Sequence, residues 1–151
     1  MKILFIHQNF PAQFRNLANH LVTTGKHELL ALKQPPSTEF EGVGVAAYKF
    51  LRNPETNTHP WLKEMEAKVL RGEAVADAAQ RLKAKGYTPD VIVAHPSWGE
   101  VLFIKDVWPK IKLICYFEYY YSAAGQDFDF DPEFHESTFT GLARLRMKNT
   151  T

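Results

Sequence analysis

Short runs of wholly apolar residues alternate with segments of helical periodicity along this chain. The runs at 3–6 (ILFI), 29–32 (LLAL) and 91–94 (VIVA) contain no polar side chain. A strand that faces solvent on one side alternates apolar and polar residues, whereas an unbroken apolar run is typical of a strand covered on both faces. Together with further candidate strands at 43–50 and 113–117, this pattern predicts a parallel sheet.

The segment after the first run has the spacing of an amphipathic helix. Its apolar residues recur at i, i+3, i+4, i+7 and i+8, as Phe14, Leu17, Ala18, Leu21 and Val22. Pro11 suits the first turn of a helix and Gly25 suits the position just past its end. The order strand, turn, helix predicts the opening of a βαβ unit.

A longer helix is predicted over residues 60–85, with Gly86 as its stop. The apolar positions that set its spacing are Leu62, Met65, Val69, Ala76, Ala79 and Leu82. Gly72 lies in the middle of this segment and weakens a helix by roughly 1 kcal/mol relative to alanine. A break near Gly72 is therefore expected.

Two more helices are predicted further along the chain. Ser97 and Glu100 have the S-x-x-E spacing of a capping box, which predicts a helix that starts there and ends before Pro109. A last helical pattern runs over residues 139–147, and no clear capping signal follows it before residue 151. We therefore expect further polypeptide to belong after this ending.

Strands that alternate with helices predict an α/β fold. We expect a Rossmann-like, open, mostly parallel sheet with helices on both faces and the strand order 3-2-1-4-5. The length of 151 residues suits one domain with its own core.

Charge and cysteine content exclude some classes of function. Eighteen Lys and Arg against 17 Asp and Glu give a net charge of +1, which disfavours nucleic acid as a partner. The single cysteine, Cys115, cannot form an internal disulfide, and the first apolar run is too short for a signal peptide. A cytoplasmic location is expected.

Polar and aromatic side chains follow three of the predicted strands. In an open parallel sheet, ligands bind at the carboxyl ends of the strands, near the point where the strand order reverses. The candidate site residues there are His7, Gln8, Asn9, Phe10, His95, Ser97, Trp98, Gly99, Glu118, Tyr119 and Tyr121. Imidazoles, amides, a carboxylate and aromatic rings together suit a polar ligand with ring faces, such as a sugar.

Each candidate also has a purely structural interpretation. His7 and His95 could simply hydrogen-bond a neighbouring backbone, and Ser97 suits a helix cap better than a nucleophile because no G-x-S-x-G turn surrounds it. Glu118 lies in a run too apolar for a solvated face, so its carboxylate must find a donor or shift its pKa, which favours a functional role. The tyrosines at 119–121 suit core or interface packing as well as stacking on a ligand.

The sequence lacks the common nucleotide and metal motifs. No G-x-G-x-x-G follows the first predicted strand and no Walker lysine motif follows any, so binding of NAD or ATP is disfavoured. Asp127, Asp129 and Asp131 have the spacing of calcium ligands. However, Pro132 occupies the position that needs glycine and Thr138 the one that needs glutamate, so no metal site is expected.

Four blocks of the sequence carry a family resemblance: residues 2–15 (KILFIHQNFPAQFR), 24–28 (TGKHE), 89–99 (PDVIVAHPSWG) and 116–121 (YFEYYY). Together they resemble the N-terminal domain of family 4 glycosyltransferases. The resemblance implies a GT-B enzyme, whose N-terminal domain holds the acceptor and whose C-terminal domain holds the nucleotide-sugar donor. It also implies that the loop 7–13 lies under the transferred sugar and the acceptor.

By this resemblance, Glu118 occupies a position that is commonly histidine in related enzymes, and Ala12 one that is commonly glycine. Residues 1–138 are then a Rossmann-like acceptor-side domain, and 139–151 start a helix leading to a C-terminal donor domain absent from this chain. His7 and Glu118 are the catalytic candidates, and no cofactor binds this domain itself. The implied activity is a retaining transfer to a sugar or lipid-linked acceptor, with the chain inactive alone.

Two other functions stay open at this point. One is a free-standing flavodoxin-like binding or signalling domain whose aromatic run is a partner interface. The other is peripheral contact with a membrane, suggested by basic residues of the predicted long helix: Lys63, Lys68, Arg71, Arg81, Lys83 and Lys85. Acidic residues interleave with them, so a solvated helix face is the better interpretation.

Overall fold

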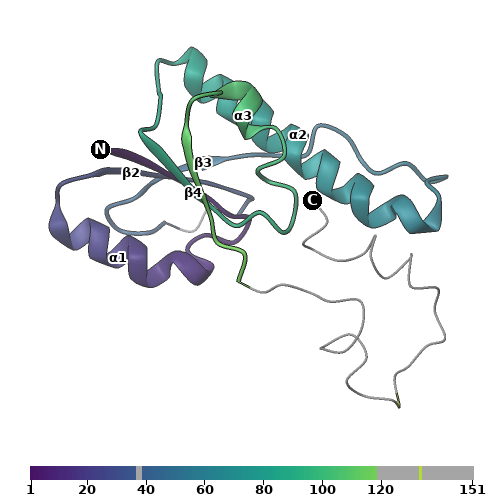
Figure 1. Cartoon of the computed structure of the whole chain (residues 1–151), viewed down its shortest axis with the longest axis horizontal. Coiled ribbons are helices and arrows are strands. Elements are labelled where there is room, and N and C mark those ends of the chain that lie inside the picture. Colours follow the sequence, from purple (N-terminus) through teal and green to yellow (C-terminus); the bar gives the residue numbers. More distant parts are fainter. Residues whose placement is uncertain (37–38, 119–132, 134–151) are drawn as a thin grey trace.

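A five-stranded parallel sheet forms the centre of the molecule (Figure 1). The structure, a computed structural model, describes residues 1–36, 39–118 and 133. The strand order β3-β2-β1-β4-β5 confirms the predicted order, and every strand pairing is parallel. The strands are β1 (Lys2–Ile6), β2 (Glu28–Lys33), β3 (Gly44–Ala47), β4 (Val91–Ala94) and β5 (Lys112–Cys115). The predicted α/β, Rossmann-like class is therefore confirmed.

The side chains of the central strand β1 divide between two cores. Leu4 and Ile6 belong to the core on one face of the sheet, and Ile3 and Phe5 belong to the core on the other. Successive side chains of a strand point to opposite faces, so an unbroken apolar run fills both. This is why the first apolar run of the sequence becomes a strand that is covered on both sides.

Helix α1 (Arg15–Thr24) covers one face of the sheet, after a 3-10 turn at Ala12–Phe14 (Figure 1). Phe14 and Ala18 are buried against this face. The helix ends at Gly25, as predicted, where a φ of 63° and a hydrogen bond from the glycine N–H to the Val22 carbonyl close the last turn. Leu17, at the edge of the predicted apolar stripe, is 42% exposed.

Helix α2 (Lys63–Ala84) covers the opposite face and follows a 3-10 turn at Pro60–Leu62. It runs without interruption through Gly72, so the predicted break is wrong. A Cβ at Gly72 would lie 2.8 Å from the Gly99 carbonyl oxygen and 3.1 Å from Leu102 Cβ. Glycine permits the loop after β4 to approach the helix closely, and this packing offsets its low helix propensity.

The buried side of α2 also differs from the predicted stripe. Leu62 is 49% exposed and lies outside the core. The buried residues are Lys68, Leu70, Gly72, Ala74, Val75, Ala78 and Ala79. Small residues let the helix lie close to the sheet over a broad side, so residue size selects this side as much as hydropathy does.

The basic residues of α2 do not form one solvated face, contrary to the expectation. Lys68 is 4% exposed. Arg71 donates a hydrogen bond to the Trp98 carbonyl and Lys83 donates one to the Val107 carbonyl. Several positive charges of this helix therefore serve contacts within the fold.

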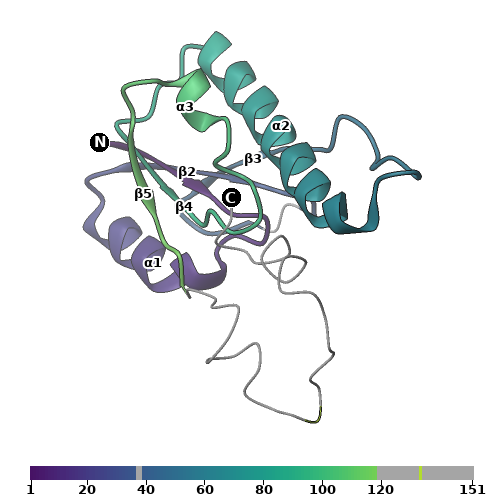
Figure 2. The ribbon, with the colours of Figure 1, turned by 45° about the vertical axis from the view of Figure 1, so that its right-hand side comes forward.

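The segment after β4 forms turns and not the predicted capped helix. Helix α3 (Ile104–Val107) begins later and lies beside α2 (Figure 2). Ser97 and Glu100 are 5% and 0% exposed, and neither side chain caps this helix. Gly99 lies between them with a φ of 98°, which takes the chain off a helical path. The predicted end before Pro109 is confirmed.

Several predicted features lie outside the described residues. They are Tyr119, Tyr121, the acidic segment with its calcium-like spacing, and the helix at 139–147. Within the described residues, no helix combines the length and the apolar character needed to span a bilayer.

Candidate functional site

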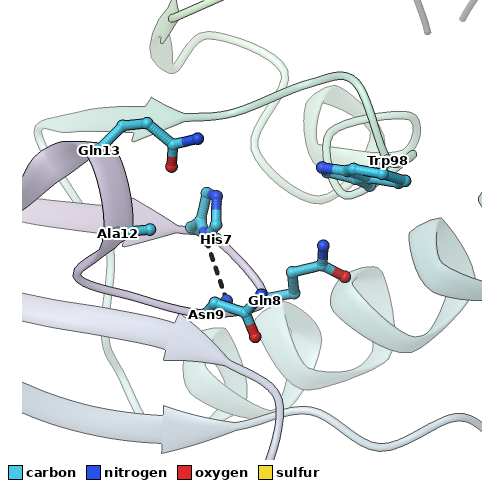
Figure 3. A pocket seen from close by; sticks show the side chains of 6 residues that line it. All are labelled: His7, Gln8, Asn9, Ala12, Gln13 and Trp98. Carbon is cyan, nitrogen blue, oxygen red and sulfur yellow. Dashed lines mark hydrogen bonds between the residues drawn. The ribbon is translucent and has the colours of Figure 1, made fainter.

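A pocket of about 500 Å³ opens at the carboxyl edge of the sheet. It is lined by His7, Gln8, Asn9, Ala12, Gln13 and Trp98 (Figure 3). All but Trp98 come from the loop after β1 and the 3-10 turn that follows it, and Trp98 comes from the loop after β4. The chain leaves β1 toward β2 on one side and returns to β4 on the other, so the pocket lies where the strand order reverses.

His7 lies in this pocket directly after β1. Its backbone N–H donates to the Leu32 carbonyl, and its Nδ1 accepts the backbone N–H of Asn9 at 2.9 Å. Burial, with His95 close by, lowers the pKa of His7 from 6.5 to about 4. Because Nδ1 accepts a hydrogen bond, the neutral ring carries its proton on Nε2.

His95 and Glu118 form a side-chain pair beside His7. The His7 and His95 rings meet edge to face, with centroids 5.4 Å apart. His95 Nε2 lies 3.1 Å from Glu118 Oε2, and Gln13 Nε2 donates to the same oxygen at 3.1 Å. With an ionised carboxylate, which can only accept a hydrogen bond, this contact requires a proton on His95 Nε2. The His95 side chain is 2% exposed and that of Glu118 is 48% exposed, which leaves the carboxylate accessible.

The backbone brings these side chains to one edge. The His95 N–H donates to the Ile6 carbonyl and the Tyr116 N–H donates to the Ala94 carbonyl, so the strands end side by side. Glu118 has a φ of 57°, in the left-handed region that residues with a Cβ seldom adopt. Such a conformation is common at functional sites.

The pocket offers the groups that hold a hydroxyl-rich ligand. Gln8, Asn9 and Gln13 supply amide donors and acceptors. In Figure 3, Trp98 and Gln8 lie on one side of His7, and Gln13 lies on the other. A ligand between them meets an aromatic ring face and convergent polar groups, which is typical of small-molecule sites.

The histidines and the carboxylate add proton chemistry. With a pKa of about 4, His7 is neutral at pH 7 and acts there as a hydrogen-bonding group. Glu118, held by His95 and Gln13, is the accessible group that can accept a proton from a ligand hydroxyl. The set therefore suits orientation and deprotonation of an alcohol.

The structure brings many of the predicted site residues together. Those in or directly beside the pocket are His7, Gln8, Asn9, Trp98, His95 and Glu118. Phe10 is 1% exposed and packs on Phe5, and Ser97 is buried. Gly99 packs against α2, where a Cβ would overlap the Lys68 carbonyl. Phe10, Ser97 and Gly99 therefore serve packing and do not line the pocket.

Two pocket residues, Ala12 and Gln13, were not individual candidates in the sequence. The signal for them was their place in the loop 7–13, which the family resemblance puts under the acceptor. Gln13 contacts Glu118 across 105 positions of the chain. A contact between residues so far apart cannot be read from one sequence.

The pocket lacks the features of a metal or dinucleotide site. No group of three or more histidine, cysteine or acidic side chains is placed to hold a metal ion within 1–36, 39–118 and 133. The loop 7–13 contains no glycine, which a backbone that approaches a pyrophosphate closely would need.

A family model described as "Glycosyl transferase family 4 group" matches residues 25–151. The matched range includes β4 and the loop with His95 and Trp98, whereas the loop 7–13 precedes it. A search of curated proteins finds no match.

Proposed function

Because the chain belongs to the glycosyl transferase family 4 group, we propose that it is the acceptor-binding N-terminal domain of a retaining, nucleotide-sugar-dependent glycosyltransferase. The observation that carries the proposal is the meeting of His7, His95 and Glu118 beside one pocket at the carboxyl edge of the sheet. A transferase must hold an acceptor hydroxyl close to the anomeric carbon of the donor, and this edge supplies groups for that task.

The residues of the site have distinct proposed roles. The Trp98 ring packs on a face of the acceptor sugar, and the amides of Gln8 and Gln13 orient its hydroxyl groups. Glu118 accepts a hydrogen bond or a proton from the reacting hydroxyl, and His95 keeps the carboxylate in place. Neutral His7 donates from Nε2 to the same ligand.

The nucleotide-sugar donor is proposed to bind a second, C-terminal domain. Catalysis of the transfer needs groups that stabilise the charge of the leaving nucleotide, in addition to groups that hold the acceptor. The described part of this chain offers acceptor-side groups, so the chain alone is expected to bind acceptor but not to transfer sugar. A transfer assay with the chain and nucleotide sugars tests this, and product formed by the chain alone would overturn the half-enzyme proposal.

Acceptor binding can be tested with saturation-transfer difference NMR and a panel of methyl glycosides. For a glycoside that binds, Trp98→Ala should weaken affinity by about 2- to 10-fold, because aromatic packing contributes about 0.5–1.5 kcal/mol beyond buried area. Trp61→Ala is the matched control, since Trp61 is 36% exposed on the 3-10 turn before α2 and does not line the pocket. An equal loss in both variants would argue against a sugar site at the pocket.

A second candidate function is a binding module with an aromatic interface. Tyr116 and Phe117 directly follow the edge strand β5 and are 49% and 52% exposed, and Ile114 within this strand is 57% exposed. If this surface binds a partner copy, light scattering should detect an oligomer that Tyr116→Ser with Phe117→Ser dissociates. A monomeric chain that binds a glycoside favours the transferase proposal instead.

A further inference from the structure

A polar cluster, made of buried Tyr48 and Glu100 and half-buried Arg71, adjoins the pocket residue Trp98. Tyr48 and Glu100 are both 0% exposed. Within the described residues, the Tyr48 hydroxyl, Arg71 Nε and both Glu100 carboxyl oxygens have no hydrogen-bond partner. Buried polar groups are nearly always bonded, so several such atoms in one place need a specific structural or functional explanation.

Arg71 supplies the positive charge that lies near both other members of this cluster. Burial raises the pKa of Glu100 to about 7, and the nearby Arg71 guanidinium partly opposes this shift. Burial raises the pKa of Tyr48, the nearby Glu100 raises it further, and Arg71 opposes both effects. The guanidinium of Arg71 also lies over the Phe50 ring, 5.6 Å from its centroid. Arg71 therefore lies near a carboxyl, a phenol and an aromatic ring.

The cluster reaches the pocket through two backbone positions. Arg71 Nη1 donates to the Trp98 carbonyl oxygen at 2.8 Å. The backbone amides of Gln8 and Trp98 lie near enough to the Glu100 carboxyl to lower its pKa in part, although none meets hydrogen-bond geometry. Gln8 and Trp98 both line the pocket, from the loops after β1 and β4.

We propose that Arg71 and Glu100 are positioning residues, which set the Trp98 side chain against the pocket by holding the backbone at residues 98–100. Gly72 and Gly99 allow α2 and this loop to approach closely, and we attribute the direction of the Trp98 carbonyl to a separate contact. The charged donor of Arg71 sets this direction. The consequence for ligand binding rests on the proposed function, whereas the orientation of Trp98 does not.

The test uses 19F NMR of the full chain labelled with 5-fluorotryptophan. The chain has three tryptophans, Trp61, Trp98 and Trp108, and single Trp→Phe variants assign their resonances. We expect Arg71→Met to shift or broaden the Trp98 resonance and to leave that of Trp61 unchanged. Arg71→Lys retains a donor for the carbonyl and should keep the wild-type position.

Arg81→Met is the matched control, because Arg81 lies on the same helix and pairs with Asp77. The proposal is overturned if Arg71→Met leaves the Trp98 resonance unchanged, or if Arg81→Met shifts this resonance as far as Arg71→Met does. The proposal is also overturned if Arg71→Lys displaces the Trp98 resonance as far as Arg71→Met does. The displacement would then result from lost packing and not from a lost hydrogen bond.

Should Arg71→Met not fold, Glu100→Gln at pH 8 provides the same test, because the wild-type carboxyl is largely ionised there. An unchanged Trp98 resonance in that variant overturns the proposal. No ligand is present in these spectra, so their outcome is separate from that of the sugar-binding test. Weaker glycoside binding in Arg71→Met than in Arg71→Lys extends the inference to ligand recognition.

Discussion

His7 and Glu100 have pKa values that one cause shifts in opposite directions. Burial disfavours a charged side chain, so it lowers the pKa of His7 to about 4 and raises that of Glu100 to about 7. Compared with the unfolded chain, the folded protein therefore binds fewer protons at His7 and more at Glu100. Both residues couple folding to pH, with opposite signs.

Between about pH 4.5 and 6.5 these two couplings should nearly cancel. The contribution of His7 is present above its ordinary pKa of 6.5 and is lost as the pH falls toward 4. The contribution of Glu100 is present below its ordinary pKa of 4.5 and is lost as the pH rises through about 7. In this window each changes the free energy of unfolding by about 1.4 kcal/mol per pH unit at most, in opposite directions.

Single substitutions should reveal separately how His7 and Glu100 make the free energy of unfolding depend on pH. The free energy of unfolding of Glu100→Gln should rise with pH between 4.5 and 6.5, and that of His7→Gln should fall over the same window. Urea denaturation at a series of pH values measures both. Glu64→Gln, at an exposed position early in α2, should leave the wild-type profile unchanged. If the free energy of unfolding varied with pH in the same way in the wild type and all three variants, this would contradict the pKa shifts of His7 and Glu100.

At the scale of elements, the contact between α2 and the loop after β4 shapes one wall of the pocket. Gly72 and Gly99 lie at this contact, and each would clash with the other element if it carried a side chain. Trp98 directly precedes Gly99 and lines the pocket. The placement of a pocket residue therefore depends on how closely a helix and a loop can approach.

Gly72→Ala should destabilise the fold, although alanine is the better helix former. The gain in helix propensity is about 1 kcal/mol. A methyl group placed 2.8 Å from the Gly99 carbonyl oxygen should cost about 1–3 kcal/mol or more. We expect a net loss of about 1 kcal/mol in the free energy of unfolding, measured with urea.

Gln80→Ala, at an exposed position of the same helix, is the control for this substitution. It should change the free energy of unfolding by less than about 0.5 kcal/mol. A Gly72→Ala protein as stable as the wild type would mean that the loop moves away from α2 at little cost. In that case the pocket wall is less firmly held than the structure indicates.

At the scale of the whole molecule, burial is greatest in the middle of the sheet. β1 lies between β2 and β4, and four of its five residues are buried. β5 is an edge strand whose residues alternate between exposed and half-buried. The pocket adjoins the ends of β1 and β4, so it is attached to the most firmly packed part of the fold.

Amide hydrogen exchange should follow this arrangement. Exchange in β1 should require unfolding of the whole domain, whereas β5 can open locally at a lower free energy. We expect peptides that cover Lys2–Ile6 to exchange about tenfold or more slowly than those that cover Lys112–Cys115, as measured by mass spectrometry. Equal protection would reveal a covering of the β5 edge in solution.

Local pattern was sufficient to predict the strands, the parallel sheet and its order. An unbroken apolar run of about four residues, bounded by turn residues, favours a strand buried on both faces because it is too short for a helix. Topology rules then place the carboxyl ends of the first and fourth strands side by side. The meeting of His7 with His95 could therefore be anticipated from their places in the chain.

Contacts between segments that are distant in the sequence determined the features that the local pattern did not predict. The capping-box spacing of Ser97 and Glu100 is worth about 1 kcal/mol to a helix, which is less than the packing of that loop against α2. That packing buries Glu100, keeps α2 continuous at Gly72 and turns Trp98 toward the pocket. Hydropathy along the chain does not indicate how closely two backbone segments approach each other in the fold. That approach decides which polar side chains are buried and which can contact a ligand.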